Sequence, residues 1–149
     1  MADSNKKEGN TDLGDKPKFR INGFYLKDVS FENPGAPKVF TAPNQQPQID
    51  MALDVQVAKV EGTAFEVVLK ANVQAKVEAE TLFMVEVLQA GLFVMNPELK
   101  KEEMEETLLV DCAYAVFPYL RRAVSELTQD GGFAPLNLEQ INFRKLYLD

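Results

Sequence analysis

Alternation of apolar and polar side chains dominates the middle of the chain. Between residues 48 and 57 the odd positions are apolar and the even positions are mostly polar, as in Ile49, Met51 and Leu53 against Gln48 and Asp50. A period of two places successive side chains on opposite faces of a strand, so this run predicts a strand with one buried and one wet face. Residues 65–77 repeat the pattern after a tight turn at residues 61–63. Two such runs joined by a short turn predict an antiparallel hairpin.

Two further strands are predicted from less regular patterns. Residues 19–31 alternate, but the phase changes at Gly23, which indicates a β-bulge or bend. The last strand, residues 81 to about 93, is apolar on both faces, with Phe83, Val85 and Val87 on one face and Leu82, Met84 and Leu88 on the other. A sheet with one solvated face does not need that second apolar set. We therefore expect a helix on one face and an oligomer interface, or a bound apolar peptide or lipid, on the other.

Helical signals follow the strands. Asn96-Pro97-Glu98 is typical of a helix start, and a long helix is predicted from about residue 97 or later to 128, with Pro118 inside it as a kink. Asn137 is predicted to cap a short final helix that runs to about residue 148. The order predicts an α+β fold: a four-stranded antiparallel sheet followed by a long kinked helix and a short C-terminal helix packed on one face. Residues 1–17, polar and without aromatic residues, are predicted to be a flexible tail, and residues 18–149 a single domain.

Composition narrows the possible chemistry. Sixteen basic against 23 acidic residues give a net charge of −7, which argues against nucleic acid or an anionic membrane as partner. The absence of histidine removes the commonest general base and the Ser-His-Asp and Cys-His pairs, and a lone Cys112 allows no disulfide framework. We expect Cys112 to be a small buried hydrophobe. No cofactor or metal is expected, and the lack of a signal sequence or membrane span predicts a cytoplasmic protein that does not insert into membranes.

Acidic residues in the two irregular strands suggest a binding surface. Asp28, Glu32 and Glu86 lie among exposed hydrophobic positions, a combination that suits a basic, partly apolar peptide, although surface acids also serve solubility alone. From the residues alone, the chain is an oligomeric α+β binding module. The alternative from another class is an oligomeric carrier of lipid or small hydrophobic ligands, which requires a deep enclosed cavity in each chain.

Several sequence blocks along the chain form a pattern. The blocks are FRINGFYLKDVSFENP at 19–34, APKVF at 36–40, FEVVLK at 65–70, ETLF at 80–83, FPYLR at 117–121, GF at 132–133, PLNL at 135–138 and NF at 142–143, with Glu86, Val87, Gln89 and Gly91 between them. In these blocks and in their order, over roughly residues 19–147, the chain resembles SecB, the bacterial protein-export chaperone family.

The resemblance implies a homotetramer, built as a dimer of dimers, that hydrolyses no nucleotide. It implies a holdase that keeps precursor proteins unfolded in the cytoplasm and hands them to the SecA motor. In the family, the zinc-bearing C-terminal tail of SecA docks on the acidic sheet face, and the matching positions here are Asp28, Glu32, Met84 and Glu86. Family positions for oligomer contacts and client binding match Val85, Val87 and Gln89. The family's client groove lies between the crossing segment, which is the long link from the first strand to the second, the second strand itself and the last helix; the matching residues here are Phe40, Ile49, Leu138 and Ile141.

Overall fold

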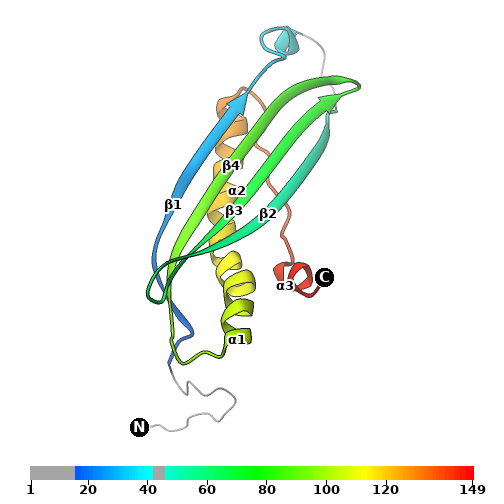
Figure 1. The fold of residues 1–149 in the computed structure, drawn as a ribbon. Helices are drawn as coiled ribbons and strands as arrows, with labels where there is room; N and C mark the ends of the chain where they lie inside the picture. The colour runs from blue at the N-terminus through cyan, green and yellow to red at the C-terminus, as the bar shows by residue number, and fades with distance from the viewer. Residues whose placement is uncertain (1–15, 42–45) are drawn as a thin grey trace, which may run out of the picture.

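The computed structural model of the protein describes residues 16–41 and 46–149. A four-stranded sheet forms one layer and a long helix packs on one of its faces (Figure 1). The described elements are, in order, β1 (Phe19–Glu32), the 3₁₀ turn η2 (Lys38–Thr41), β2 (Gln48–Glu61), β3 (Ala64–Val77), β4 (Glu80–Met95), α1 (Lys101–Glu106), the π-helical turn η3 (Thr107–Cys112), α2 (Ala113–Asp130) and α3 (Phe143–Leu148). The predicted α+β class, with its four strands, one long helix and one short helix, is confirmed.

Residues 1–15 of the predicted tail lie outside the described residues. The last two residues of the predicted tail, Lys16 and Pro17, are described, and both contact the loop that follows β4. The ammonium of Lys16 lies 3.6 Å from a carboxylate oxygen of Glu98, and the Pro17 carbonyl accepts a 3.2 Å hydrogen bond from Asn96 Nδ2. These contacts link the start of the described chain to the beginning of the helical layer.

All neighbouring strands in the sheet are antiparallel, and their order is β1-β4-β3-β2. Short turns join β2, β3 and β4 into the predicted meander, whereas β1 lies at the far edge beside β4. Gly62, in the turn between β2 and β3, has φ +57°, a conformation that glycine adopts without steric strain. The long connection containing η2 therefore separates two strands that lie at opposite edges of the sheet.

Strand β1 contains two β-bulges. The first, between Ile21 and Gly23, is at the predicted change of phase. The second lies between Leu26 and Asp28 and was not predicted. Because the second bulge reverses the alternation, Tyr25 points to the face opposite Val29, although both occupy odd-numbered positions.

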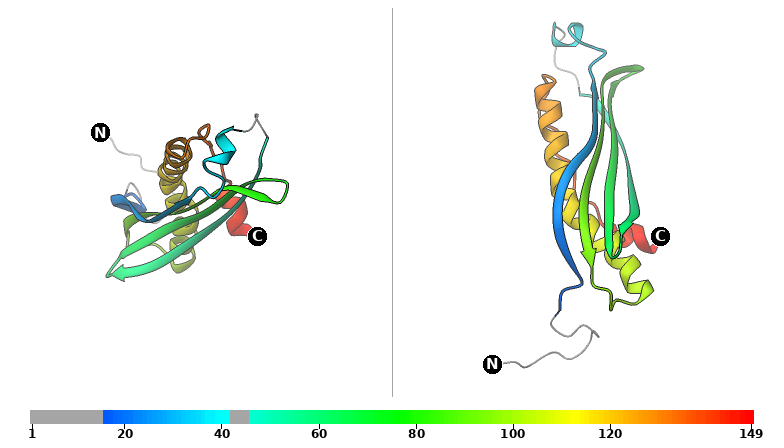
Figure 2. Two further views of the ribbon diagram at one scale, coloured as in Figure 1. Left: turned by 90° about the horizontal axis from the view of Figure 1, so that it is seen from above. Right: turned by 60° about the vertical axis from the view of Figure 1, so that its left-hand side comes forward.

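The hydrophobic core lies between the sheet and the helix (Figure 2). Alternate residues of β3 and β4 face this core, and α2 supplies the opposing side chains, including Val116, Leu120 and Val124, each with no exposed surface. The face of the sheet turned away from α2 is called the outer face below. In the described part of the chain, no helix combines the length and the apolar character that crossing a bilayer requires.

The long helix begins later than the Asn96 motif predicted. Asn96 Oδ1 instead accepts a 2.9 Å hydrogen bond from the Glu98 amide within a turn, and α1 starts at Lys101. The helix continues through Pro118 to Asp130. Its departure from α-helical hydrogen bonding lies upstream of the proline, at η3.

The final helix is shorter than predicted, and its cap is a different asparagine. Asn142 Oδ1 accepts a 3.0 Å hydrogen bond from the Lys145 amide, and α3 covers only Phe143–Leu148. Residues 134–142, which include Asn137, form no regular element. The prediction of a helix capped by Asn137 is therefore wrong, and the reason is that tertiary contacts hold this segment extended.

Candidate functional site

Strand register brings the predicted acidic residues together on the outer face. Glu32 in β1 is paired with Met84 in β4, and Ser30 is paired with Glu86 two positions along. Glu32, Met84 and Glu86 line one shallow hollow, together with Ser30, Asn72, Val73, Gln74 and Val85. Asp28, paired with Leu88, lies in the next row of the same face. The four positions matched to a SecA contact thus form one surface that combines carboxylates with a methionine.

One lysine interrupts this acidic surface. Lys70 Nζ in β3 lies 3.4 Å from Glu86 Oε2. The side chains are 36% and 37% exposed, respectively. The pair is therefore in contact with solvent, where an ion pair contributes little to stability.

A polar arch crosses the middle of the outer face. The Tyr25 hydroxyl donates a 2.6 Å hydrogen bond to Glu66 Oε2, and Lys27 Nζ donates one of 3.1 Å to Oε1 of the same carboxylate. Both side chains extend from β1 over β4 to β3, above Ala90, which has no exposed surface. The arch covers part of the second apolar face of β4 within the chain itself.

The contacts of the arch shift the pKa values of Tyr25 and Glu66. Partial burial and the hydrogen bond to Glu66 raise the pKa of Tyr25 to about 12. Burial alone would raise the pKa of Glu66, but the hydrogen bonds from Tyr25 and Lys27 and the charge of Lys27 lower it. Both shifts favour the neutral phenol beside the ionised carboxylate.

Three predicted contact residues of β4 lie on the helix-facing side of the sheet. Val85 and Val87 are 2% and 0% exposed beneath α2. Gln89 is 4% exposed, and its Nε2 donates a 3.2 Å hydrogen bond to the Tyr25 carbonyl. Any influence of the two valines on assembly or client binding must therefore act through the packing of helix on sheet.

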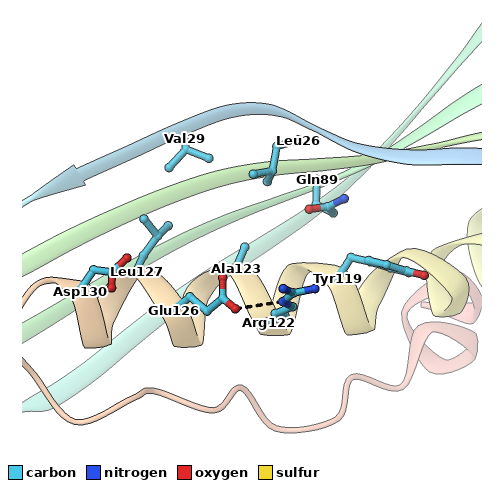
Figure 3. Close-up of a pocket in the computed structure, with 9 residues that line it drawn as sticks. All are labelled: Leu26, Val29, Gln89, Tyr119, Arg122, Ala123, Glu126, Leu127 and Asp130. Carbon is cyan, nitrogen blue, oxygen red and sulfur yellow. Dashed lines mark hydrogen bonds and ion pairs between the residues drawn. The ribbon is translucent and has the colours of Figure 1, made fainter.

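An open groove separates β1 from α2 (Figure 3). The groove is lined by Leu26, Val29, Gln89, Tyr119, Arg122, Ala123, Glu126, Leu127 and Asp130. Leu26 is 52% exposed and Val29 37%, although both belong to the helix-facing side of β1. Figure 3 shows Ala123 and Leu127 pointing from the helix toward the sheet, while the ion pair of Arg122 with Glu126, 3.0 Å long, lies along the helix. This β1–α2 groove is an apolar surface with a charged rim.

A second apolar surface begins at the crossing segment. Ring centroids are 5.9 Å apart for Phe31 and Phe83, 4.8 Å for Phe83 and Phe133, and 5.3 Å for Phe133 and Phe40. The series passes from the core to the surface, because Phe83 is 4% exposed and Phe40 49%. Gly132 allows the Phe40 ring to approach: a Cβ there would lie 2.8 Å from the ring, and the φ of +97° also favours glycine. Phe40 is thus an exposed aromatic residue on a packed aromatic support.

The extended segment after α2 is bound to the helix by side chains. The Leu136 amide donates a 3.0 Å hydrogen bond to Thr128 Oγ1. Farther along, Arg121 donates from Nε to the Leu138 carbonyl at 3.2 Å and from Nη2 to Gln140 Oε1 at 3.0 Å. The guanidinium also lies 4.9 Å above the ring centroid of Phe117. These bonds fix the segment against one side of α2.

A third contact completes this row. Tyr114 Oη accepts a 3.1 Å hydrogen bond from the Phe143 amide. Tyr114, Arg121 and Thr128 are spaced by seven residues, which is close to two helical turns, so they lie along one side of the helix. Together they form a three-rung ladder between the helix and residues 136–143.

The remaining predicted groove residues differ in exposure. Ile49, near the start of β2, is 39% exposed. Leu138 is 7% exposed and belongs to the core, and Ile141 is partly buried against that core. Phe40 and Ile49 therefore expose apolar surface, whereas Leu138 anchors the extended segment after α2 to the core.

The cysteine is buried in the hydrophobic core. Cys112 has no exposed surface, as predicted, and burial foremost, with a contribution from Asp111, raises the pKa of its thiol to about 12. Among the described residues, no three His, Cys, Asp or Glu side chains gather in a group that could hold a metal ion.

Sequence comparison identifies the family. The profile of the family described as "Preprotein translocase subunit SecB" matches residues 13–149. The chain belongs to the SecB family. Among its curated relatives, the "Protein-export protein SecB" of Parvibaculum lavamentivorans is 39% identical over 140 residues, covering 93% of this chain and 82% of the relative. That of Granulibacter bethesdensis is 41% identical over 139 residues, covering 88% and 81%.

A solved structure agrees with the SecB fold. A SecB-like chaperone of Mycobacterium tuberculosis, solved in complex with a ChAD peptide from the HigA1 antitoxin, superposes with a TM-score of 0.71 at 22% identity and covers 83% of this chain and 91% of that one. Family and fold predictions are thus both confirmed, and membership of the SecB family makes this protein a protein-export chaperone.

Proposed function

We propose that this SecB-family chaperone assembles as a homotetramer, holds precursor proteins unfolded in the cytoplasm and delivers them to SecA. The observation that carries the proposal is the division of the sheet into two faces. The outer face gathers carboxylates around Met84, while exposed apolar residues lie on the helix-facing side and at the crossing segment. Two kinds of partner can therefore be bound at separate places.

Assembly is supported by the β1–α2 groove and by the position of β1 at the edge of the sheet. Leu26 and Val29 expose apolar surface there, and an edge strand offers unpaired backbone groups to another copy. The interface is built from this strand and the long helix, in a dimer of dimers. Leu26→Glu is expected to reduce the tetramer to smaller species in native mass spectrometry and light scattering.

Val60→Glu is the matched control for the assembly test. Val60 is 57% exposed at the other edge strand, β2, and does not line the groove. It is expected to leave the mass unchanged. A wild-type monomer at micromolar concentration would contradict the proposed assembly.

Client binding is supported by Phe40 and Ile49, which present exposed apolar side chains around the crossing segment. An unfolded precursor offers many short apolar stretches, so several weak contacts along one chain give avidity without sequence specificity. Phe40→Ser is expected to weaken binding of a reduced, unfolded precursor by about tenfold in fluorescence anisotropy, the range of a strong interface residue. Phe40→Tyr, which keeps the ring, is expected to retain most of the affinity, and equal losses for both variants would exclude this role.

Delivery is supported by the acidic hollow on the outer face. A lysine-rich, zinc-bound SecA tail would gain from Asp28, Glu32 and Glu86, and Met84 would supply an adaptable apolar contact. Glu86→Lys is expected to weaken SecA binding in a salt-dependent way while leaving assembly and client binding intact. Glu61→Lys, at the end of β2, is the control for charge alone. If Glu86→Lys binds SecA normally, or loses client binding first, the hollow is not the docking site.

A further inference from the structure

Lys70 occupies the centre of the acidic part of the outer face. Strand register places it opposite Leu88 in β4 and Asp54 in β2, in the same row as Asp28 of β1. Glu86, the carboxylate in the adjacent row, lies 3.4 Å from its ammonium group. Lys70 thus lies within the group of carboxylates that makes this surface attractive to cations.

The charges of this region are mostly negative. The carboxylates on this part of the described outer face are Asp28, Glu32, Asp50, Asp54 and Glu86, and the lysines are Lys70 and Lys76. Lys76 lies near the end of β3, opposite Gln48 and Thr81, whereas Lys70 contacts Glu86 directly. Lys70 is therefore the lysine that a cationic ligand would meet at Glu86.

We propose that Lys70 is a competing cation of the docking surface, holding Glu86 until a partner's cationic side chain displaces it. The inference rests on the proposed function, because it concerns the binding of a cationic, partly apolar tail at this same surface. An arriving ammonium and Lys70 repel each other and share one carboxylate. Lys70 therefore lowers the affinity of the surface and shortens the lifetime of the complex.

The geometry allows this exchange at small cost. Both partners of the pair are more than one third exposed, so Lys70 can turn into solvent without leaving a buried charge. A buried pair would resist displacement, because separating its members leaves an uncompensated charge in a low-dielectric site. A weak pair in the middle of a docking surface suits a contact that must form and dissociate during each transfer.

The test uses the full-length protein in its native assembly and the Lys70→Gln variant. The probes are the zinc-loaded SecA C-terminal peptide and, separately, octalysine, each followed by titration calorimetry at low and high salt. We expect Lys70→Gln to bind both probes about two- to fivefold more tightly at low salt, the range of one exposed ion pair. The gain should shrink at high salt, where exposed charges are screened. In a Glu86→Gln background the same substitution should give a smaller gain.

Lys76→Gln is the matched control, because it removes the same charge from the same strand and face. If Lys76→Gln raises the affinity for the probes less than Lys70→Gln does, the position of the lysine matters as well as its charge. Equal gains for the two variants, or no gain for Lys70→Gln, would overturn the inference. If octalysine binding tightens while the SecA peptide binds neither protein, the inference about Lys70 holds and the proposed partner is wrong. If neither probe binds any of the proteins, both proposals fail.

Discussion

Among the three contacts between the long helix and residues 136–143, the hydrogen bond to Thr128 is the one whose loss has the most calculable effect on stability. The residue has no exposed surface. Its hydroxyl accepts the Leu136 amide hydrogen at 3.0 Å and donates to the Val124 carbonyl at 2.9 Å. Thr128→Val keeps the shape of the side chain and removes both bonds. The helix carbonyl retains its own backbone bonding, so the principal loss is an acceptor for the Leu136 amide.

The cost follows from leaving that donor unpaired. A buried polar group without a partner costs about 1–3 kcal/mol, and partial burial of this bond places the expected loss at about 1–2 kcal/mol. For a chain of this size each kcal/mol lowers Tm by about 2–4 °C, which gives a fall of about 2–8 °C. Because the protein is expected to be oligomeric, wild type and variant must be compared at one protein concentration.

Amide hydrogen exchange tests the mechanism separately from overall stability. Thr128→Val should lose protection at Leu136 and its neighbours, because the segment opens without unfolding the sheet. Thr128→Ser is the control: it loses a methyl group from the core and some stability, but it keeps the hydroxyl and should keep the protection. Unchanged exchange at Leu136 in Thr128→Val, or equal loss in Thr128→Ser, would show that the hydroxyl does not hold the segment.

Three other substitutions or titrations test separate parts of the fold. Gly131→Ala places a Cβ 2.2 Å from the Phe31 ring, so the ring must move. The free energy of unfolding, measured by chemical denaturation, should fall by about 1–3 kcal/mol. Gly23→Ala is the control, because no heavy atom lies within 4 Å of the added Cβ, and it should not show this loss. Cys112, with its buried thiol and a pKa of about 12, should not react with an aromatic disulfide reagent at neutral pH until denaturant is added; fast reaction of the native protein would contradict the buried position. Tyr25 has its pKa raised from 10.0 to about 12, so its contribution to stability is complete below pH 10 and is lost as the pH rises through about 12. Ultraviolet titration should show a tyrosine transition near pH 12, and Tyr25→Phe should remove it.

The strands were predictable because their burial is periodic. In β2 the partly buried positions are Met51, Leu53 and Val55, with exposed residues between them, and the alternation of residues 48–57 alone indicates this period. The hollow on the outer face was predictable for a related reason. Glu32, Met84 and Glu86 occupy positions of like parity on paired strands, so correct register is enough to bring them together.

The second bulge of β1 and the path after α2 were not predictable from periodicity. Lys27 is an ordinary residue within a strand, and the sequence carries no glycine to mark the bulge beside it. Asn137 and Asn142 are both suitable helix caps, and local sequence does not distinguish them. The choice is made by Arg121 and Tyr114, which bind the intervening segment across at least 17 residues of sequence. Hydrogen bonds between a helix side chain and a distant backbone group leave no periodic signal.

The alternation of β4 also separates the two proposed binding functions. Glu86 points to the outer face, while its neighbours Val85 and Val87 are buried under α2. A partner on the outer face therefore does not compete for space with a client or a second copy on the helix side. Coupling between the two faces has to pass through the thickness of one sheet. Gln89 joins them most directly, because it lines the β1–α2 groove and donates to the carbonyl of Tyr25, whose side chain forms the arch on the outer face. The two proposed sites therefore let a client stay bound on the helix side while the proposed partner docks on the outer face, and this proposal makes release depend on what that partner does to the client rather than on exchange at a shared site.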